Sequence, residues 1–156
     1  MALIQSIVIA ADMHYIWPLI ADPLRQLDWN PKIISLDRSR SGPVHVGERF
    51  IMLFQMNKRQ RESAVEVIES LPPTRLRLRH ASTWNNRPQI IDEAYDLSPA
   101  SSGVRVVQTI DFSPSGIPRL IRALLWFLSR FGQNVQEPTL HRLKSLAEAA
   151  SVATRP

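Results

Sequence analysis

The 156-residue sequence contains no cysteine, few glycines and no apolar run long enough to cross a membrane. The absence of cysteine excludes disulfide bonds and thiolate metal sites. The longest apolar segment, residues 117–131, is shorter than the roughly 20 residues that a membrane-spanning helix needs, and it contains arginines. The apolar start of the chain, residues 1–11, has no basic segment before it, so we expect no signal peptide. Cytoplasmic residence is the resulting expectation.

Several catalytic and binding motifs are also missing. The histidines show no spacing typical of metal ligands, so we expect no bound metal; they are His14, His45, His80 and His141. The sequence has neither a glycine-rich phosphate loop nor a Gly-x-Ser-x-Gly turn, which argues against a nucleotide site and a serine nucleophile. We therefore expect no cofactor.

Basic residues outnumber acidic ones by 19 to 14, which gives a formal net charge of +5. Such an excess can attract nucleic acid, anionic lipid or acidic ligands. The basic residues are spread out, however, and only the segment Lys58–Arg61 is compact. A solvated hairpin turn is the favoured interpretation of this cluster, and an anion-binding patch is the alternative. Because no aromatic residues are interleaved with it, we expect no nucleic-acid binding.

Proline and glycine divide the chain into short segments, and the length predicts one domain over residues 1–156. Apolar and polar residues alternate most clearly where Leu76, Leu78 and His80 interleave with three arginines. Similar patterns predict strands near residues 6–10, 50–57, 64–69, 91–97 and 104–112. Six or seven strands joined by short turns predict an antiparallel sheet with one buried face.

Helical periodicity flanks these strands. Residues 13–21 form a short apolar segment that Asp12 can cap. Residues 117–131 carry apolar side chains at helical spacing, Gly132 can end that helix, and a further helix is expected from Pro138. Short helices after the first strand, then strands, then a long C-terminal helical region, predict an α+β fold.

The same segments resemble the SRPBCC superfamily, which includes START-like and polyketide cyclase-like proteins. Five segments carry the resemblance, in chain order: Ala11–Asp22, Asp28–Pro31, the glycine hairpin of residues 42–50 with its Gly47–Phe50 motif, Val65–Leu76 and Leu140–Glu148. It implies a helix-grip fold, in which a curved antiparallel sheet of six to seven strands wraps around a long C-terminal helix. Gly132 and Pro138 depart from the continuous helix usual in the superfamily, so residues 117–131 are open to a role as lid, subunit contact or membrane-surface element, beside simple packing.

In a helix-grip fold the concave face and the long helix enclose a cavity, and the alternation then assigns the residues that point inward. The predicted apolar lining comprises Phe50, Met52, Phe54, Val65, Val67, Leu76, Leu78, Ile91, Val106 and Ile110, with Leu124 and Leu128 from the helix. Methionine and phenylalanine give an adaptable wall. This lining predicts a hydrophobic guest.

Four polar side chains share the inward faces, namely His80, Glu93, Tyr95 and Gln108. Buried polar groups need partners. They can form an internal hydrogen-bond network, which is the favoured interpretation, or anchor a ligand hydroxyl or carbonyl. A third interpretation is acid–base catalysis, for which His80, Glu93 and Tyr95 are the candidate catalytic residues.

The leading functional prediction is non-catalytic binding or transport of a small hydrophobic ligand, such as a lipid, quinone, isoprenoid or aromatic polyketide. The resemblance permits two alternatives: a polyketide cyclase or dehydratase-like enzyme, and a chaperone-activator-like interaction module that uses residues 117–131. The sequence leaves monomer or homodimer, and peripheral membrane contact, open.

Overall fold

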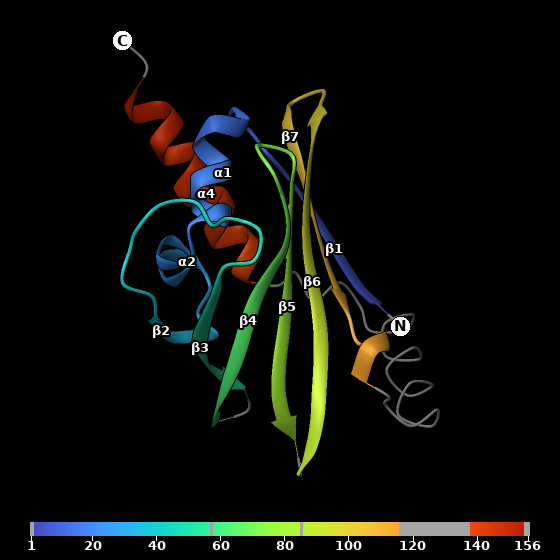
Figure 1. The fold of residues 1–156 in the computed structure, drawn as a ribbon. Helices are drawn as coiled ribbons and strands as arrows, with labels where there is room; N and C mark the ends of the chain where they lie inside the picture. The colour runs from blue at the N-terminus through green and yellow to red at the C-terminus, as the bar shows by residue number, and fades with distance from the viewer. Residues whose placement is uncertain (1, 57, 85, 116–137, 155–156) are drawn as a thin grey trace.

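The computed structural model describes residues 2–56, 58–84, 86–115 and 138–154 (Figure 1). Its elements are β1 (Ala2–Ile9), α1 (Met13–Ala21), α2 (Pro23–Trp29), β2 (Ile33–Asp37), β3 (Arg49–Met56), β4 (Arg59–Leu71), β5 (Arg75–Trp84), β6 (Arg87–Ala100), β7 (Gly103–Asp111), the 3-10 helix η1 (Ser113–Ser115) and α4 (Pro138–Ala153). Seven strands form one antiparallel sheet in the order β1-β7-β6-β5-β4-β3-β2. The helices α1, α2 and α4 lie on one side of it, toward the end with the β6–β7 turn (Figure 1). The predicted α+β helix-grip architecture is confirmed.

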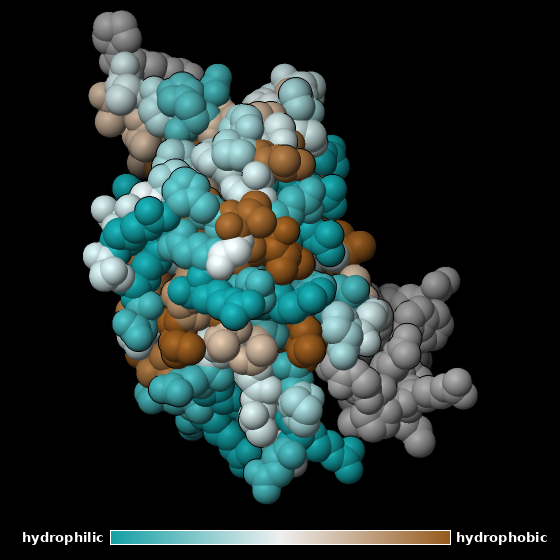
Figure 2. All heavy atoms as spheres, viewed as in Figure 1, coloured by the Kyte–Doolittle hydropathy of each residue, from teal (hydrophilic) through white to brown (hydrophobic). Residues whose placement is uncertain are grey.

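The alternation in β5 has the orientation that the sequence predicted. Leu76 and Leu78 are fully buried on the inner face, whereas Arg79 points outward and forms a bidentate pair with Asp92 of β6, with both N–O distances 2.8 Å. Strand register keeps inner residues beside inner residues, since Leu78 pairs with Val67 on one side and Glu93 on the other. On the face seen in Figure 2, hydrophilic side chains dominate and apolar ones form small groups.

Two aspartates fix the corner between the first helices. The Asp12 carboxylate accepts from His14 N at the start of α1, as predicted, and Asp22 accepts from Leu24 N at the start of α2. These caps satisfy backbone donors that have no helical partner. The following Trp29 closes the corner, because its indole Nε1 donates to the Leu19 carbonyl at 2.8 Å.

The C-terminal helix α4 begins at Pro138, as predicted, and side chains of the helix hold it to the end of β1 and the residue that follows. Leu143 and Ala147 are completely buried. Lys144 Nζ donates to the Val8 carbonyl at 3.1 Å, and Glu148 accepts from Ala10 N at 2.9 Å. The predicted helix over residues 117–131, with Leu124 and Leu128, lies outside the described residues.

The first strand is longer than the sequence indicated. The β-branched run predicted a strand over residues 6–10, whereas β1 begins at Ala2 and ends at Ile9. Pairing with β7 along the whole length, from Ala2 opposite Asp111 to Ile9 opposite Val104, supplies backbone partners that do not depend on local propensity. The extension adds Leu3 and Gln5 to the inner face.

Candidate ligand-binding site

The four inward polar side chains that the sequence singled out meet in one hydrogen-bonded network. Tyr95 OH donates to Glu93 Oε1 at 2.6 Å, and Gln108 Nε2 donates to the same oxygen at 2.6 Å. Gln108 Nε2 also donates to Tyr95 OH at 2.9 Å. The second carboxylate oxygen, Glu93 Oε2, lies 3.1 Å from His80 Nε2. The network therefore joins β5, β6 and β7 across the inner face.

Strand register explains why these residues meet. Tyr95 of β6 lies directly opposite Gln108 of β7. Glu93 is two residues from Tyr95 and so faces the same side of the sheet. On the other flank, Leu78 of β5 lies opposite Glu93, which places His80, two residues further along, diagonal to the carboxylate.

The network holds Glu93 as a carboxylate. Burial raises the pKa of Glu93, but hydrogen bonds and charge from His80, with hydrogen bonds from Tyr95 and Gln108, outweigh it and lower the pKa below its usual value. Because a carboxylate only accepts hydrogen bonds, the His80 Nε2 that faces it carries the proton. The side chains of His80 and Glu93 remain 9% and 13% exposed, so the network is not sealed.

The predicted apolar lining divides into two zones on either side of this network. The inner residues toward the helices are buried: Phe50, Met52, Val65, Val67, Leu76, Leu78 and Val106. Those toward the β5–β6 turn are half-buried: Phe54, Ile91 and Ile110. Leu3 of β1, which was not in the predicted set, lies opposite Ile110 and is also half-buried. The polar network thus lies where the packed core gives way to inner-face side chains that retain accessible apolar surface.

Aromatic rings support the network from two directions. Trp29 packs edge-on against Tyr95, with ring centroids 6.2 Å apart, and the Phe54 ring lies 5.6 Å from the His80 ring. Trp29 is fully buried and belongs to the core. Such contacts restrict the rotation of Tyr95 and His80.

Gln5 is an inner-face residue that the sequence reasoning missed as a site residue. It lies directly opposite Gln108 in the β1–β7 register. The side-chain oxygens Oε1 of Gln5 and Gln108 are both buried, and neither has a hydrogen-bond partner within the described part of the chain. The polar band therefore extends from His80 on β5 to Gln5 on the edge strand β1.

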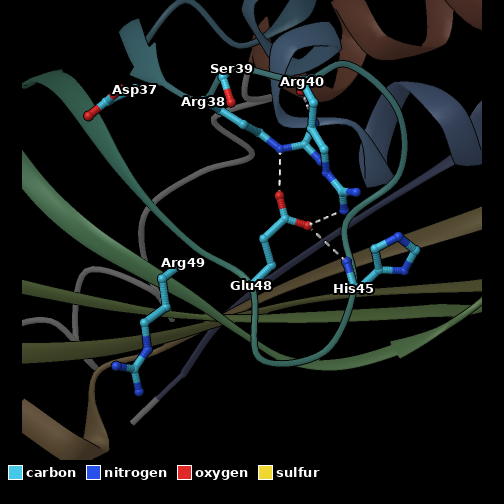
Figure 3. Close-up of a pocket in the computed structure, with 7 residues that line it drawn as sticks. All are labelled: Asp37, Arg38, Ser39, Arg40, His45, Glu48 and Arg49. Atoms are coloured by element: carbon cyan, nitrogen blue, oxygen red, sulfur yellow. Dashed lines mark hydrogen bonds and ion pairs between the residues drawn. The ribbon is translucent and has the colours of Figure 1, made fainter.

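A different, open pocket of about 470 Å³ lies at the loop between β2 and β3 (Figure 3). Its lining residues are Asp37, Arg38, Ser39, Arg40, His45, Glu48 and Arg49. Glu48 accepts from Arg38 Nε at 2.8 Å, Arg40 Nη2 at 3.1 Å and the backbone N of His45 at 3.1 Å. Arg38 Nη1 also contacts Asp22 at 3.2 Å. Since acidic partners neutralise these arginines, we interpret the cluster as structural.

We expect the variant Glu48→Gln to lose about 2 kcal/mol of unfolding free energy at pH 7, after allowance for solvent screening. Burial raises the pKa of Glu48, but Arg38, the backbone N–H of His45 and Arg40 lower it to about 2, from an ordinary value of 4.5. Because the folded pKa is depressed, this stabilisation is complete above pH 4.5 and is lost as the pH falls toward 2.

Urea unfolding of both proteins at pH 7 and pH 3 measures this effect, and the difference between them should shrink at pH 3. The control is Glu66→Gln, which removes an exposed pair with Arg49 and should change stability by less than about 0.5 kcal/mol. A difference for Glu48→Gln that is the same at both pH values contradicts the expectation.

The basic cluster Lys58–Arg61 lies at the predicted hairpin between β3 and β4, where Lys58 adopts a φ of 64°. Among the described residues, no helix combines the length and apolar character needed to cross a membrane. Within the same ranges, no group of three or more histidine or carboxylate side chains is arranged to hold a metal ion.

Comparison with known proteins identifies a family over nearly the whole chain. Residues 3–148 match the sequence model of the family described as "Polyketide cyclase / dehydrase and lipid transport". No curated protein sequence gives a significant match.

Solved structures of the same fold include a protein from Chromobacterium violaceum, with a TM-score of 0.66, 20% identity, and coverage of 94% of this chain and 96% of that one. A protein from Rhodobacter sphaeroides has a TM-score of 0.68 and 18% identity, with coverage of 96% and 93%. DynU16, a protein in the dynemicin biosynthetic locus, has a TM-score of 0.64 and 15% identity, with coverage of 96% of this chain and 48% of that one. At these identities the likeness concerns the fold.

Proposed function

We propose that this chain, which belongs to the polyketide cyclase / dehydrase and lipid transport family, binds a small hydrophobic molecule on the inner face of its sheet. The observation that supports this most directly is the position of the polar network beside accessible apolar side chains. The guest's apolar body lies against Phe54, Ile91 and Ile110, and its polar group meets the network at Glu93. Leu124 and Leu128, which the sequence also predicts to line the site, lie outside the described residues and stay predictions.

Hydrophobic burial supplies most of the affinity in this proposal. Removing apolar surface from water yields about 25 cal/mol per Å², so about 200 Å² yields about 5 kcal/mol before the entropy of association is subtracted. The polar network fixes the orientation of the guest, because an apolar group placed against the free acceptor positions of Glu93 would remove them from water without giving them a partner. A carrier needs nothing more than these two features.

The convergence of His80, Glu93 and Tyr95 favours one second candidate, a cyclase or dehydratase-like activity. Glu93 accepts the Nε2 proton of His80 and thereby orients the ring, which leaves Nδ1 as the proton acceptor when the ring is neutral. In this candidate His80 Nδ1 removes a proton from a carbon beside a guest carbonyl. Variant His80→Gln distinguishes the two functions, since an enzyme loses turnover while a carrier retains binding.

The interaction-module alternative concerns residues 117–131, outside the described part of the chain, and stays a prediction.

We expect the variant Ile110→Phe to weaken binding of the neutral fluorescent probe N-phenyl-1-naphthylamine at least tenfold. A larger side chain at this half-buried inner position occupies the space assigned to the guest's apolar body. Fluorescence titration measures the affinity, and native mass spectrometry gives the stoichiometry.

The matched control is Ile4→Phe on the outer face of β1, where the isoleucine is 66% exposed. This variant should bind the probe like the natural protein. Absence of saturable binding to the natural protein, or equal effects of the two substitutions, overturns the proposed function.

A further inference from the structure

The hydrogen-bond network leaves a surplus of acceptors. Every contact that Glu93 makes within it brings a donor to the carboxylate: the Tyr95 hydroxyl, the Gln108 amide and the His80 ring. A carboxylate offers about four acceptor positions, so these donors do not exhaust it. Its partial exposure leaves the remaining capacity within reach of a guest.

The side-chain oxygen of Gln108 is a further acceptor. The two hydrogen-bond partners of Nε2 decide which end of the amide is the nitrogen and which is the oxygen. Both hydrogens of Nε2 are used, one toward Glu93 Oε1 and the other toward Tyr95 OH. Turning the amide over would place Oε1 against the carboxylate, oxygen to oxygen, which is repulsive. The amide oxygen is therefore the atom left buried and unpaired among the described residues.

Gln5 contributes a second buried oxygen on the same face. Directly opposed residues of antiparallel strands have Cβ atoms roughly 4.5–5.5 Å apart, so Gln5 and Gln108 are neighbours in this register. Its Oε1 is also buried without a partner in the described ranges. A buried unpaired acceptor destabilises the empty protein, and a donor from a guest removes that penalty.

We propose that the polar end of the site, formed by Glu93, Gln108 and Gln5, selects a guest with a neutral hydroxyl donor, such as a phenol or alcohol, and rejects an anionic one. The inference rests on the proposed function and narrows its ligand class. A carboxylate on the guest would bring a second negative charge beside Glu93 and supply no donor to either glutamine oxygen. An ether of the same shape has no donor, so it would leave the free acceptor positions of the site without a partner.

Three naphthalene probes of the same ring system test this selection at pH 7, where 2-naphthol is a neutral donor, 2-methoxynaphthalene has no donor and 2-naphthoate is an anion. Calorimetric titration should show 2-naphthol binding at least tenfold more tightly than either of the others, a difference of about 1.4 kcal/mol. If none of the probes and no other apolar compound binds, the proposed function fails. If the ether or the anion binds as tightly as the phenol, this inference fails while the proposed function stands.

A variant of Gln5 separates recognition from stability. Gln5→Met keeps the length of the side chain and removes the unpaired oxygen. The ratio of the affinities for 2-naphthol and the ether should therefore be at least threefold smaller in this variant than in the natural protein. Thermal stability of the empty protein should be equal or higher, because a buried unpaired acceptor is gone. The control Ser6→Ala changes an exposed position and should leave the preference intact. An unchanged preference in Gln5→Met removes Gln5 from the proposed selection.

Discussion

Replacement of Trp29 by alanine is expected to lower the unfolding free energy by about 3 to 5 kcal/mol, the range for truncating a buried aromatic side chain. Trp29 is completely buried, and it couples α2 to α1 through the hydrogen bond from Nε1 to the Leu19 carbonyl. Its removal leaves a cavity and an unpaired carbonyl, and it also removes the edge contact with Tyr95. Equilibrium unfolding in urea measures the loss.

The variant Trp29→Phe provides the matched control for this substitution. It retains most of the buried ring but cannot donate to Leu19, so we expect a smaller loss of about 1 to 2 kcal/mol. A loss below about 1 kcal/mol for Trp29→Ala contradicts the core role of Trp29. A large loss for both variants, without a difference between them, assigns the effect to the hydrogen bond rather than to packing.

The variant Gly103→Ala is expected to lose about 3 kcal/mol of stability. Gly103 opens β7 with a φ of +143°, and a Cβ there would lie 2.0 Å from the Ile9 carbonyl oxygen. The backbone of β1 would have to move away, which disturbs the Ile9–Val104 pairing at this end of the sheet. Thermal and urea unfolding both report the loss.

Gly42→Ala is the matched control, because Gly42 has a φ of +102° but open space around the position of a Cβ. Alanine at position 42 has the backbone strain of a positive φ but no steric clash, so we expect this variant to lose only about 1 kcal/mol of unfolding free energy. If Gly103→Ala and Gly42→Ala lose the same amount of unfolding free energy, the close approach of β7 to β1 does not restrict position 103 to glycine, contrary to what the structure indicates.

The inner face of the sheet could be predicted from the sequence because side chains in a strand alternate with a period of two. Once Leu76 and Leu78 are assigned to the core, His80 follows on the same face, and the same reasoning places Glu93 and Tyr95 together. The distance between His80 and Glu93 did not follow from alternation. It depends on strand register, which pairs Leu78 with Glu93 and is set by the geometry of the turn.

The parts that escaped prediction depend on contacts between distant segments. Gln5 was missed as a site residue because the start of β1 has no β-branched run, and pairing with β7 alone extends the strand over it. Trp29 could not be assigned because its burial results from the corner between α1 and α2. The roles of Leu124 and Leu128 stay predictions, since they lie outside the described residues.

The central proposal is a guest on the inner face, with its apolar body beside Ile91 and Ile110 and its polar group at Glu93. A crystal structure of the protein grown with saturating 2-naphthol tests it most directly. The proposal predicts the naphthalene ring in contact with Phe54, Ile91 or Ile110 and the hydroxyl within hydrogen-bonding distance of Glu93, Gln108 or Gln5. A probe found only in the pocket beside Arg38 and Glu48, with the inner face unchanged, would contradict it.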